Sequence, residues 1–320
     1  MYKVLYFDYA PEDVYEIIRS HVPAGFELVT LKEDSEDERR RILPEVDFLV
    51  VATAKVTKDH FQIARKLKMI QHQGVGYDGT DVEEAKKRGI LIGLTPEGTT
   101  IGVAEHTILL ILAVYKRLVT AHTSLQKGQW LQFGLRSVSF ELHGKTLGLL
   151  GFGRIGQETA KRALAFGARV IYHDPYLPSS VKETVQSYGK EVDFPTLLQE
   201  ADILSLHIPL TPETRGIIHR NVFTQMKPTA ILINTARGKL VVEKDLIEAL
   251  QTKRIAGAGL DVFETEPVSK DNPLLFMDNV IVTPHIAAGT VDALHEKMSA
   301  VFANLLRLVQ GERPKNLIGT

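Results

Sequence analysis

The sequence predicts an α/β protein with two doubly wound domains whose sheets are mostly parallel. Three observations support this prediction. The 320 residues exceed the usual size of a single domain. Short apolar runs alternate with helical patterns along the chain, which is typical of βαβ units. Several of these runs lack a polar residue at every second position, as expected for strands that helices cover on both faces.

The expected elements follow the chain in order. Strands are expected at VLYF near Val4, FLVVA near Phe48, MIQH near Met69, ILIGL near Ile90, LGLLG near Leu147, RVIYHD near Arg169, ILSLHI near Ile203, AILINT near Ala230, AGLDV near Gly259 and VIVTPHI near Val280. One helix is expected from about Thr100 to Thr123, where ILLILAV is apolar on every side, so we expect part of it to meet a partner chain. A final helix is expected from Val291 to Gln310, because Gly311 and Pro314 follow it.

Two stretches rich in turn-forming residues mark the domain boundaries. They are LTPEGTT at 94–100 and TPHIAAGT at 283–290. The final helix then completes the first domain after a long insertion. We therefore expect one domain from 1–98 plus 290–320, and an inserted domain at 99–289.

The composition excludes several classes of function. A hydrophobic fraction of 44% with 24% charged residues is ordinary for a globular protein. With a formal net charge of -1, the chain has no overall positive charge that would attract nucleic acid or an anionic membrane. The absence of cysteine removes thiolate ligands, and no HExxH pattern occurs, so no metal is expected.

The sequence also predicts a cytoplasmic location. The opening MYKVLYFDYAPED has a short apolar run followed by acidic residues, unlike a signal peptide. The apolar stretch from Ile101 to Val119 is interrupted by charged residues and is too short to span a bilayer. Neither export nor membrane insertion is expected.

The strongest local motif is GFGRIG, which contains Gly151, Gly153 and Gly156 between an apolar run and a helical segment. Glycines at these positions allow a tight turn, close approach of a pyrophosphate and close packing of helix on strand. Asp174 ends the next strand, where a carboxylate can hold the ribose 2′-hydroxyl and repel a 2′-phosphate. The motif therefore predicts NAD, while Arg154 and His173 leave NADP as an alternative.

The order of seven motifs resembles the D-2-hydroxyacid dehydrogenase family over nearly the whole chain. These motifs are GVGYD, VAEHT, ELHGKTLGLLGFGRIG, HIPLTPETRGII, INTARG, GLDVFETEP and TPHIAAG. The resemblance implies two Rossmann-like domains with the active site in the cleft between them. The 1–98 plus 290–320 domain would be the flavodoxin-like substrate (catalytic) domain, and 99–289 the NAD-binding Rossmann domain. It further implies a homodimer and a small 2-keto or 2-hydroxy acid substrate.

The same resemblance implies three catalytic residues. Arg237 in INTARG matches the arginine that binds the substrate carboxylate and carbonyl, for which a guanidinium offers a fixed fork of donors. His285 matches the acid/base residue, and Glu266 matches the carboxylate that orients it. Reduction of a carbonyl by hydride creates alkoxide character, so a protonated imidazole must donate a proton there.

Further binding residues are implied by position in the motifs. Val75 and Gly76 match the loop whose backbone N–H groups receive the substrate carboxylate, with Arg237 and His285 completing the substrate contacts. His106 in VAEHT is interpreted as a packing residue. The positions implied for the cofactor are Thr107, Gly151, Gly153, Arg154, Ile155, Gly156, Asp174, His207, Pro209, Thr214, Thr235, Ala236, Arg237, Asp261, His285 and Ala287.

Departures from the family leave the substrate open. Ile286, Ala287 and Ala288 follow His285 where many relatives carry glycine or serine, and Gln73 before the glycine loop also differs from some branches. A phosphonate (phosphite) dehydrogenase would share the same catalytic set and stays an alternative. An NAD-sensing, corepressor-like binding protein is the alternative from another class, which the intact catalytic set disfavours. Glu266 counts against a formate dehydrogenase.

Overall fold

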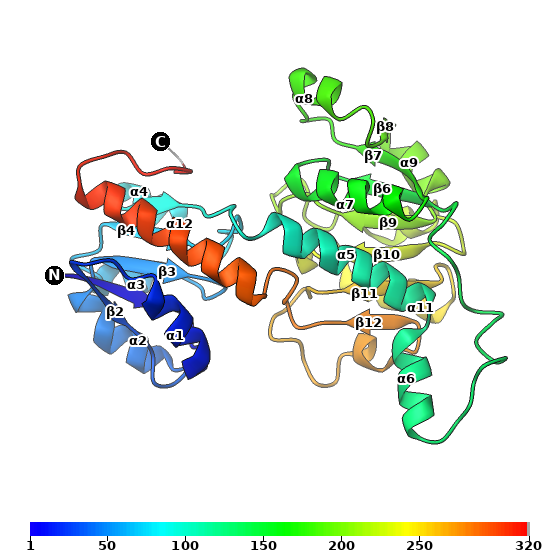
Figure 1. Ribbon diagram of the computed structural model, residues 1–320, viewed down its shortest axis with the longest axis horizontal. Coiled ribbons are helices and arrows are strands. Elements are labelled where there is room, and N and C mark those ends of the chain that lie inside the picture. Colours follow the sequence, from blue (N-terminus) through cyan, green and yellow to red (C-terminus); the bar gives the residue numbers. More distant parts are fainter. Residues whose placement is uncertain (319–320) are drawn as a thin grey trace. The chain divides into compact units, whose positions relative to one another are not determined.

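The computed structural model of the protein describes residues 1–318 and divides the chain into two compact units (Figure 1). The first unit comprises Met1–Thr99 and Gly289–Thr320, and the second comprises Thr100–Ala288. Residues 319 and 320, which end the expected 290–320 segment, lie outside the described part.

The first unit is built on a five-stranded parallel sheet in the order β2-β1-β3-β4-β5. Its strands are β1 (Tyr2–Tyr6), β2 (Phe26–Val29), β3 (Phe48–Val51), β4 (Met69–His72) and β5 (Leu91–Gly93). Its helices are α1 (Glu12–Ser20), α2 (Glu36–Ile42), α3 (Lys58–Ile63), α4 (Val82–Lys87) and α12 (Val291–Val309), with a 3-10 turn at Leu43–Glu45. This strand order is the flavodoxin-like one, which reverses between β1 and β3.

Alternate residues of the first sheet serve two different cores. Leu5, Leu49 and Ile70 belong to one hydrophobic cluster, and their chain neighbours Val4, Val50 and Met69 belong to the other. The second cluster is completed by Met298, Val301, Phe302 and Leu305 of α12. Helix α12 therefore covers one face of a sheet whose strands come from the beginning of the chain.

The second unit has a seven-stranded sheet in the order β12-β11-β10-β9-β6-β7-β8, with every pair parallel. Its strands are β6 (Thr146–Leu150), β7 (Arg169–His173), β8 (Lys190–Glu191), β9 (Ile203–Leu206), β10 (Ile231–Asn234), β11 (Gly257–Leu260) and β12 (Val280–Val282). Its helices are α5 (Thr100–Tyr115), α6 (Leu118–Gln126), α7 (Arg154–Ala165), α8 (Ser179–Thr184), α9 (Phe194–Glu200), α10 (Arg220–Phe223) and α11 (Glu243–Gln251), with 3-10 turns at Gly238–Leu240 and Pro273–Phe276.

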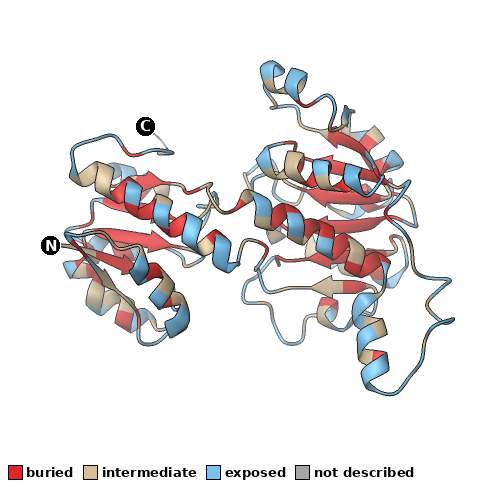
Figure 2. Cartoon of the chain, in the orientation of Figure 1, coloured by how far each residue is buried: buried red, intermediate tan, exposed pale blue. Residues whose placement is uncertain are grey.

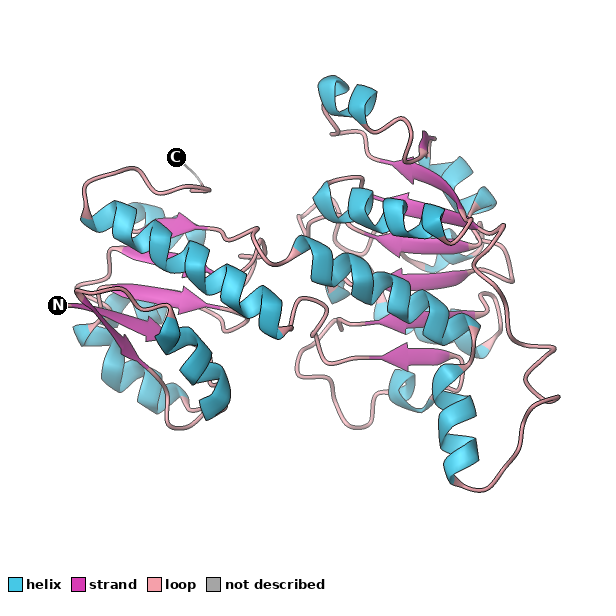
Figure 3. Ribbon diagram, viewed as in Figure 1, coloured by secondary structure: helices cyan, strands magenta, loops and turns pink. Residues whose placement is uncertain are grey.

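Helices cover both faces of this second sheet (Figure 3), and its central strands are buried (Figure 2). All five residues of β6 and all four residues of β9 are buried, which explains why their sequences lack polar alternation. The strand order reverses between β6 and β9, and in such sheets ligands bind beyond the carboxyl ends of the strands at this reversal. The predicted α/β class with two parallel sheets is confirmed.

The expected single helix from Thr100 to Thr123 is wrong. Arg117 has the left-handed φ of 52°, so the chain forms two helices, α5 and α6, bent by 61°. Within residues 1–318 no single helix is long and apolar enough to cross a membrane, and α5 and α6 satisfy those criteria only as a bent pair.

Candidate active site

The GFGRIG motif forms the turn between β6 and α7. Gly151 has a φ of +95°, and a Cβ atom there would lie 2.6 Å from the His207 carbonyl oxygen. A Cβ at Gly156 would lie 2.6 Å from the Gly151 carbonyl oxygen, so the first turn of α7 packs directly on the loop. At Gly153, by contrast, no atom lies within 4 Å of such a Cβ. The first and third glycines of the motif are therefore packed against the protein, whereas the space around the middle glycine is open.

This turn leaves the N-terminus of α7 uncapped. Gly153 is the N-cap residue, and no side chain caps the helix. The N–H groups of Arg154, Ile155 and Gly156 have no acceptor inside the helix, since its hydrogen bonds begin when the Gln157 N–H donates to the Gly153 carbonyl. Three donors beside an open glycine suit a pyrophosphate anion. The residues present thus fit a dinucleotide cofactor.

Asp174 is attached to the same turn. Its Oδ2 atom accepts a hydrogen bond from the Phe152 N–H at 2.8 Å, and its Oδ1 atom accepts one from the Tyr176 N–H at 3.1 Å. The carboxylate is therefore held at the carboxyl end of β7. His173 Nδ1 instead donates to the Val192 carbonyl at 2.9 Å, while Arg154 is exposed.

Several expected cofactor positions follow strands β9 and β10, at or next to the sheet reversal. His207 follows β9, and its Nε2 atom lies 2.9 Å from Ser205 Oγ, while burial lowers the pKa of His207 to about 4. The Thr214 hydroxyl donates to the Pro209 carbonyl at 2.7 Å and closes the following turn. The Thr107 and Thr235 hydroxyls, both buried, lie 3.0 Å apart.

Arg237 lies beyond the carboxyl end of β10 on a constrained backbone. The Asn234 side chain donates to the Arg237 carbonyl at 2.9 Å and accepts from the Ala236 N–H at 3.1 Å. Gly238 packs so closely that a Cβ atom there would overlap the Phe263 carbonyl. This close approach brings the Arg237 loop next to the segment that leads to Glu266.

Glu266 and His285 form a hydrogen-bonded pair. Glu266 Oε2 lies 2.7 Å from His285 Nδ1, and each side chain is 34% exposed. Glu266 Oε1 accepts a second hydrogen bond, from the Phe263 N–H at 2.9 Å. Burial disfavours the charged carboxylate, but these two hydrogen bonds and the charges of His285 and Arg237 outweigh burial and lower the pKa of Glu266. The structure thus joins two residues that the motifs predicted as partners.

Asp261 has partners that the sequence did not reveal. It is fully buried, and its carboxylate accepts hydrogen bonds from the Thr283 hydroxyl and from the N–H groups of Ile286 and Ala287. His106, which the sequence assigned to packing, lies 2.9 Å from the Thr283 hydroxyl through its Nε2 atom. Both Thr283 and His106 sit inside recognised motifs, but a motif does not show which side chains pair.

The glycine loop of the first unit follows β4. Its Gly74 carbonyl accepts from the Thr95 N–H at 3.0 Å, and its Val75 side chain is exposed. In the described chain, the N–H groups of Val75 and Gly76 donate to no protein acceptor. Just before the loop, the Tyr6 hydroxyl donates to Gln73 Oε1 at 3.1 Å. The loop therefore offers two adjacent backbone donors at the carboxyl edge of its sheet.

Among residues 1–318, no group of three or more His, Asp or Glu side chains is arranged to hold a metal ion.

Comparison with known proteins establishes the family. Residues 108–287 match the family model described as D-isomer specific 2-hydroxyacid dehydrogenase, NAD binding domain. The chain belongs to the D-isomer specific 2-hydroxyacid dehydrogenase family. The resemblance found in the motifs is thereby confirmed.

Three curated relatives are similar over most of this chain. A D-3-phosphoglycerate dehydrogenase of Methanocaldococcus jannaschii is 42% identical over 99% of this chain, which spans only 59% of that relative. A hydroxypyruvate reductase of Thermotoga maritima is 45% identical, covering 83% of this chain and 85% of its own. A glyoxylate reductase of Thermococcus litoralis is 45% identical, and the match covers 86% of this chain and 84% of that relative.

Two solved structures share the fold over almost the whole chain. NAD-dependent formate dehydrogenase from Staphylococcus aureus, in complex with NAD, superposes with a TM-score of 0.89 at 28% identity, covering 100% of this chain and 99% of that one. An acyclic imino acid reductase, in complex with NADPH and D-Arg, superposes with a TM-score of 0.83 at 31% identity, covering 99% of each. Of these two proteins of similar fold, one is therefore bound to NAD and the other to NADPH.

Proposed function

We propose that this protein is an oxidoreductase that transfers a hydride between NAD(H) and C2 of a small D-2-hydroxy acid or 2-keto acid. The observation that carries the proposal is the His285–Glu266 hydrogen bond, because a carbonyl reduction needs a positioned proton donor. Family membership and the dinucleotide-compatible turn of α7 support it. When bound, the nicotinamide supplies or accepts the hydride.

His285 is the proposed acid and base. Its Nδ1 atom is committed to Glu266, so Nε2 is the nitrogen that exchanges a proton with the substrate oxygen. Glu266 fixes the ring orientation and, as a carboxylate, stabilises the imidazolium. In reduction the charged ring donates its proton as the alkoxide forms, and in oxidation the neutral ring removes the hydroxyl proton.

Arg237 and the glycine loop are the proposed substrate anchors. The guanidinium of Arg237 suits bidentate binding of a carboxylate. The N–H groups of Val75 and Gly76, which have no protein acceptor in the described residues, likewise suit a carboxylate. Anchoring the substrate carboxylate orients C2 for hydride transfer.

NAD is the proposed cofactor in preference to NADP. Asp174 is fixed by the Phe152 N–H at the end of β7, where the adenine ribose is bound in such folds. A carboxylate at this point accepts from the ribose hydroxyls and repels a 2′-phosphate. The N–H groups of Arg154, Ile155 and Gly156 are the proposed pyrophosphate donors. His207, Pro209, Thr214, Thr107, Thr235, Ala236 and Ala287 remain proposed cofactor contacts.

The proposed substrates are short 2-keto acids such as glyoxylate and hydroxypyruvate, after the names of two relatives. The test is NADH absorbance during incubation with glyoxylate, hydroxypyruvate, pyruvate and 3-phosphohydroxypyruvate, with phosphite and NAD in a separate reaction. Turnover of a keto acid supports the proposal. Turnover of phosphite alone would establish the phosphonate alternative, and NADH binding without any turnover would establish a sensor.

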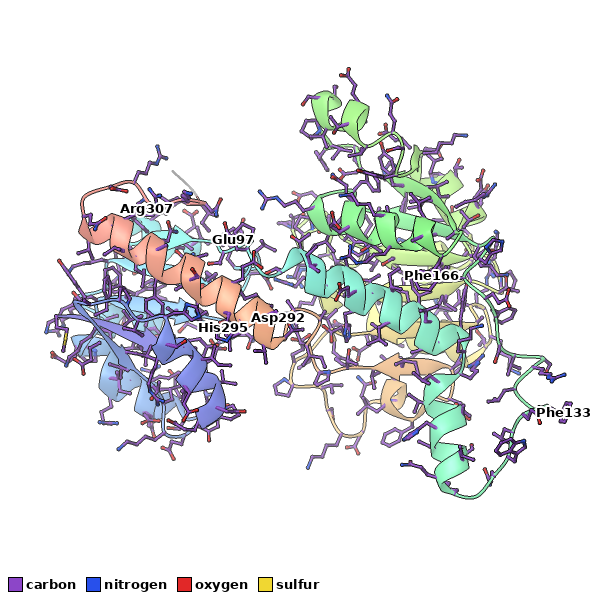
Figure 4. The ribbon with its side chains drawn as sticks, viewed as in Figure 1. Glu97, Phe133, Phe166, Asp292, His295 and Arg307 are labelled. Carbon is purple, nitrogen blue, oxygen red and sulfur yellow. The ribbon has the colours of Figure 1, made fainter. Side chains whose placement is uncertain are left out.

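A homodimer is also proposed, through exposed apolar side chains of α6 and the segment after it. These are Leu118, Val119, Leu125, Trp130 and Phe133. Figure 4 shows Phe133 on the long segment that follows α6.

The cytoplasmic location expected from the sequence stays a prediction.

A further inference from the structure

Asp261 accepts four hydrogen bonds from the loop that carries His285, while the Thr283 N–H donates to the Leu260 carbonyl at 2.9 Å. The loop runs from Thr283 to Ala287, and Pro284 within it has no N–H group. The donors to Asp261 are the Thr283 hydroxyl (2.6 Å, to Oδ1), the His285 N–H (2.8 Å, to the carbonyl oxygen), the Ile286 N–H (2.9 Å, to Oδ1) and the Ala287 N–H (2.8 Å, to Oδ2). Asp261 therefore fixes the loop on both sides of the imidazole.

The backbone of His285 needs such support. Its φ is 55°, in the left-handed region that L residues with a Cβ atom adopt only at a cost. Hydrogen bonds to the amides before and after a strained residue can hold it there. The Asp261 carboxylate is fully buried, so its oxygens are available to these donors without competition from bulk water.

His106 extends this arrangement to α5. The single hydroxyl proton of Thr283 goes to Asp261, so the 2.9 Å contact between His106 Nε2 and Thr283 Oγ1 requires His106 to donate. His106 Nε2 also lies 3.5 Å from Asp261 Oδ1. The loop is thus tied to helix α5 through a histidine whose Nε2 carries a proton.

We propose that Asp261, together with Thr283 and His106, is a positioning group that sets the geometry of the His285–Glu266 pair. This inference rests on the proposed function of His285 as the acid and base. The family resemblance places Asp261 among the cofactor positions, and its contacts with the loop give it this further role. The charged or titratable groups around the pair are then Arg237 near Glu266, and Asp261 and His106 behind the loop.

The mildest test removes one hydroxyl. Thr283→Val keeps the shape of the side chain but cannot donate to Asp261 or accept from His106, whereas Thr283→Ser keeps the hydroxyl. We expect Thr283→Val to lower kcat for keto-acid reduction by on the order of 10-fold, since misplacement of a catalytic group by 1 Å can cost about 10²-fold. Thr283→Ser should stay close to wild type.

Two further readouts separate positioning from a cofactor contact or from lost stability. The dissociation constant of NADH, measured by fluorescence, should be unchanged in Thr283→Val. The falling limb of the pH profile for reduction should move to lower pH, because a displaced ring loses part of its bond to Glu266. His106→Leu should behave like Thr283→Val, and His106→Gln, whose amide can donate in place of Nε2, should restore activity.

A stronger variant is Asp261→Asn, which places an amide N–H against a backbone donor of the loop. If it unfolds, the Thr283 and His106 pairs still decide the matter. Equal kcat and superimposable pH profiles for Thr283→Val and Thr283→Ser would overturn the inference, as would a weaker NADH affinity at unchanged kcat. The ring NMR signals of His285 must change position in Thr283→Val and stay in place in Thr283→Ser, and this measurement does not require turnover. A wild-type protein inactive on every keto acid would instead refute the proposed function.

Discussion

The Nδ1 atom of His285 lies 2.7 Å from Oε2 of Glu266, and the Phe263 N–H holds the other oxygen of the same carboxylate. Glu266 is thus fixed at both oxygens before any substrate arrives. Because these contacts lower the pKa of Glu266, it is ionised throughout the neutral range. The pair is prepared to stabilise a charged imidazole, and this leads directly to a pH dependence.

Reduction and oxidation should have opposite pH profiles, because reduction needs a charged His285 and oxidation a neutral one. Glu266→Gln removes the negative charge that favours the imidazolium. We expect the falling limb of reduction to shift to lower pH in this variant. Initial rates measured in both directions from pH 5 to 10 would check this, and a profile that did not move would show that Glu266 is not the partner that matters.

His285→Ala should lose on the order of 10²- to 10⁴-fold in kcat, the usual contribution of a positioned acid or base. NADH binding should persist, because the turn of α7 is built from other residues. Near-normal turnover by His285→Ala would place the acid elsewhere.

Arg237→Ala should raise KM as well as lower kcat, since losing a contact with the carboxylate weakens both the binding of the substrate and the stabilisation of the transition state.

The wild-type protein should prefer NADH to NADPH, and Asp174→Ser should narrow that preference. The reason is like-charge repulsion between the carboxylate and a 2′-phosphate. The ratio of kcat/KM for the two cofactors measures it, with Asp193→Ser as a control because Asp193 caps α9 and has no expected role in the cofactor site. Equal ratios in wild type and Asp174→Ser would contradict the assignment.

His207 should make the protein less stable in acid. Its pKa is lowered from 6.5 to about 4 by burial, so the unfolded chain takes up the proton first as the pH falls. The stability that depends on a neutral His207 is therefore present above pH 6.5 and is lost progressively towards pH 4. Between pH 7 and 4.5 this loss is about 2 to 3 kcal/mol. The free energy of unfolding, measured by denaturant titration across this pH range, should lack this loss in His207→Gln. The same pH dependence in the wild type and the variant would disprove the role of His207.

Light scattering at micromolar concentration should give a mass above the 35.6 kDa of one chain. Trp130 is 75% exposed and Phe133 is 72% exposed, so replacing both by arginine should favour the monomer. Phe166→Arg is the matched control, because Phe166 is 47% exposed but lies after α7, away from this segment in the sequence. A wild-type monomer would exclude the homodimer under these conditions.

Every strand expected from an apolar run occurs in the structure, but β2 and β8 were not predicted. Both are edge strands with one neighbour each. β2 reads FELV and β8 is the exposed dipeptide Lys190–Glu191, so neither carries the continuous apolar pattern of a strand covered on both faces. The break at Arg117 also escaped prediction, because a single left-handed residue leaves no signal in an apolar helical pattern.

The catalytic pair could be predicted because each residue sits in a motif of the family. The support behind it could not, since Asp261, Thr283 and His106 are distant in sequence and meet only when β11, β12 and α5 pack together. Periodicity indicates which face of an element is buried. It does not indicate that the buried carboxylate of Asp261 accepts from a loop rather than from a ligand.

Helix α12 is translated well after the strands of the sheet that it covers. Val4, Phe48 and Val50 lack their contacts with Met298, Val301 and Phe302 until α12 has left the ribosome, although α1 already packs in the same cluster. During synthesis the second unit can complete its own core while the first still exposes an apolar surface. Domains that fold as units during translation normally do so from the N-terminus. Here the first unit needs α12, which follows the second unit in the chain, so part of its sheet lacks a partner and is open to aggregation while nearly two hundred further residues are translated.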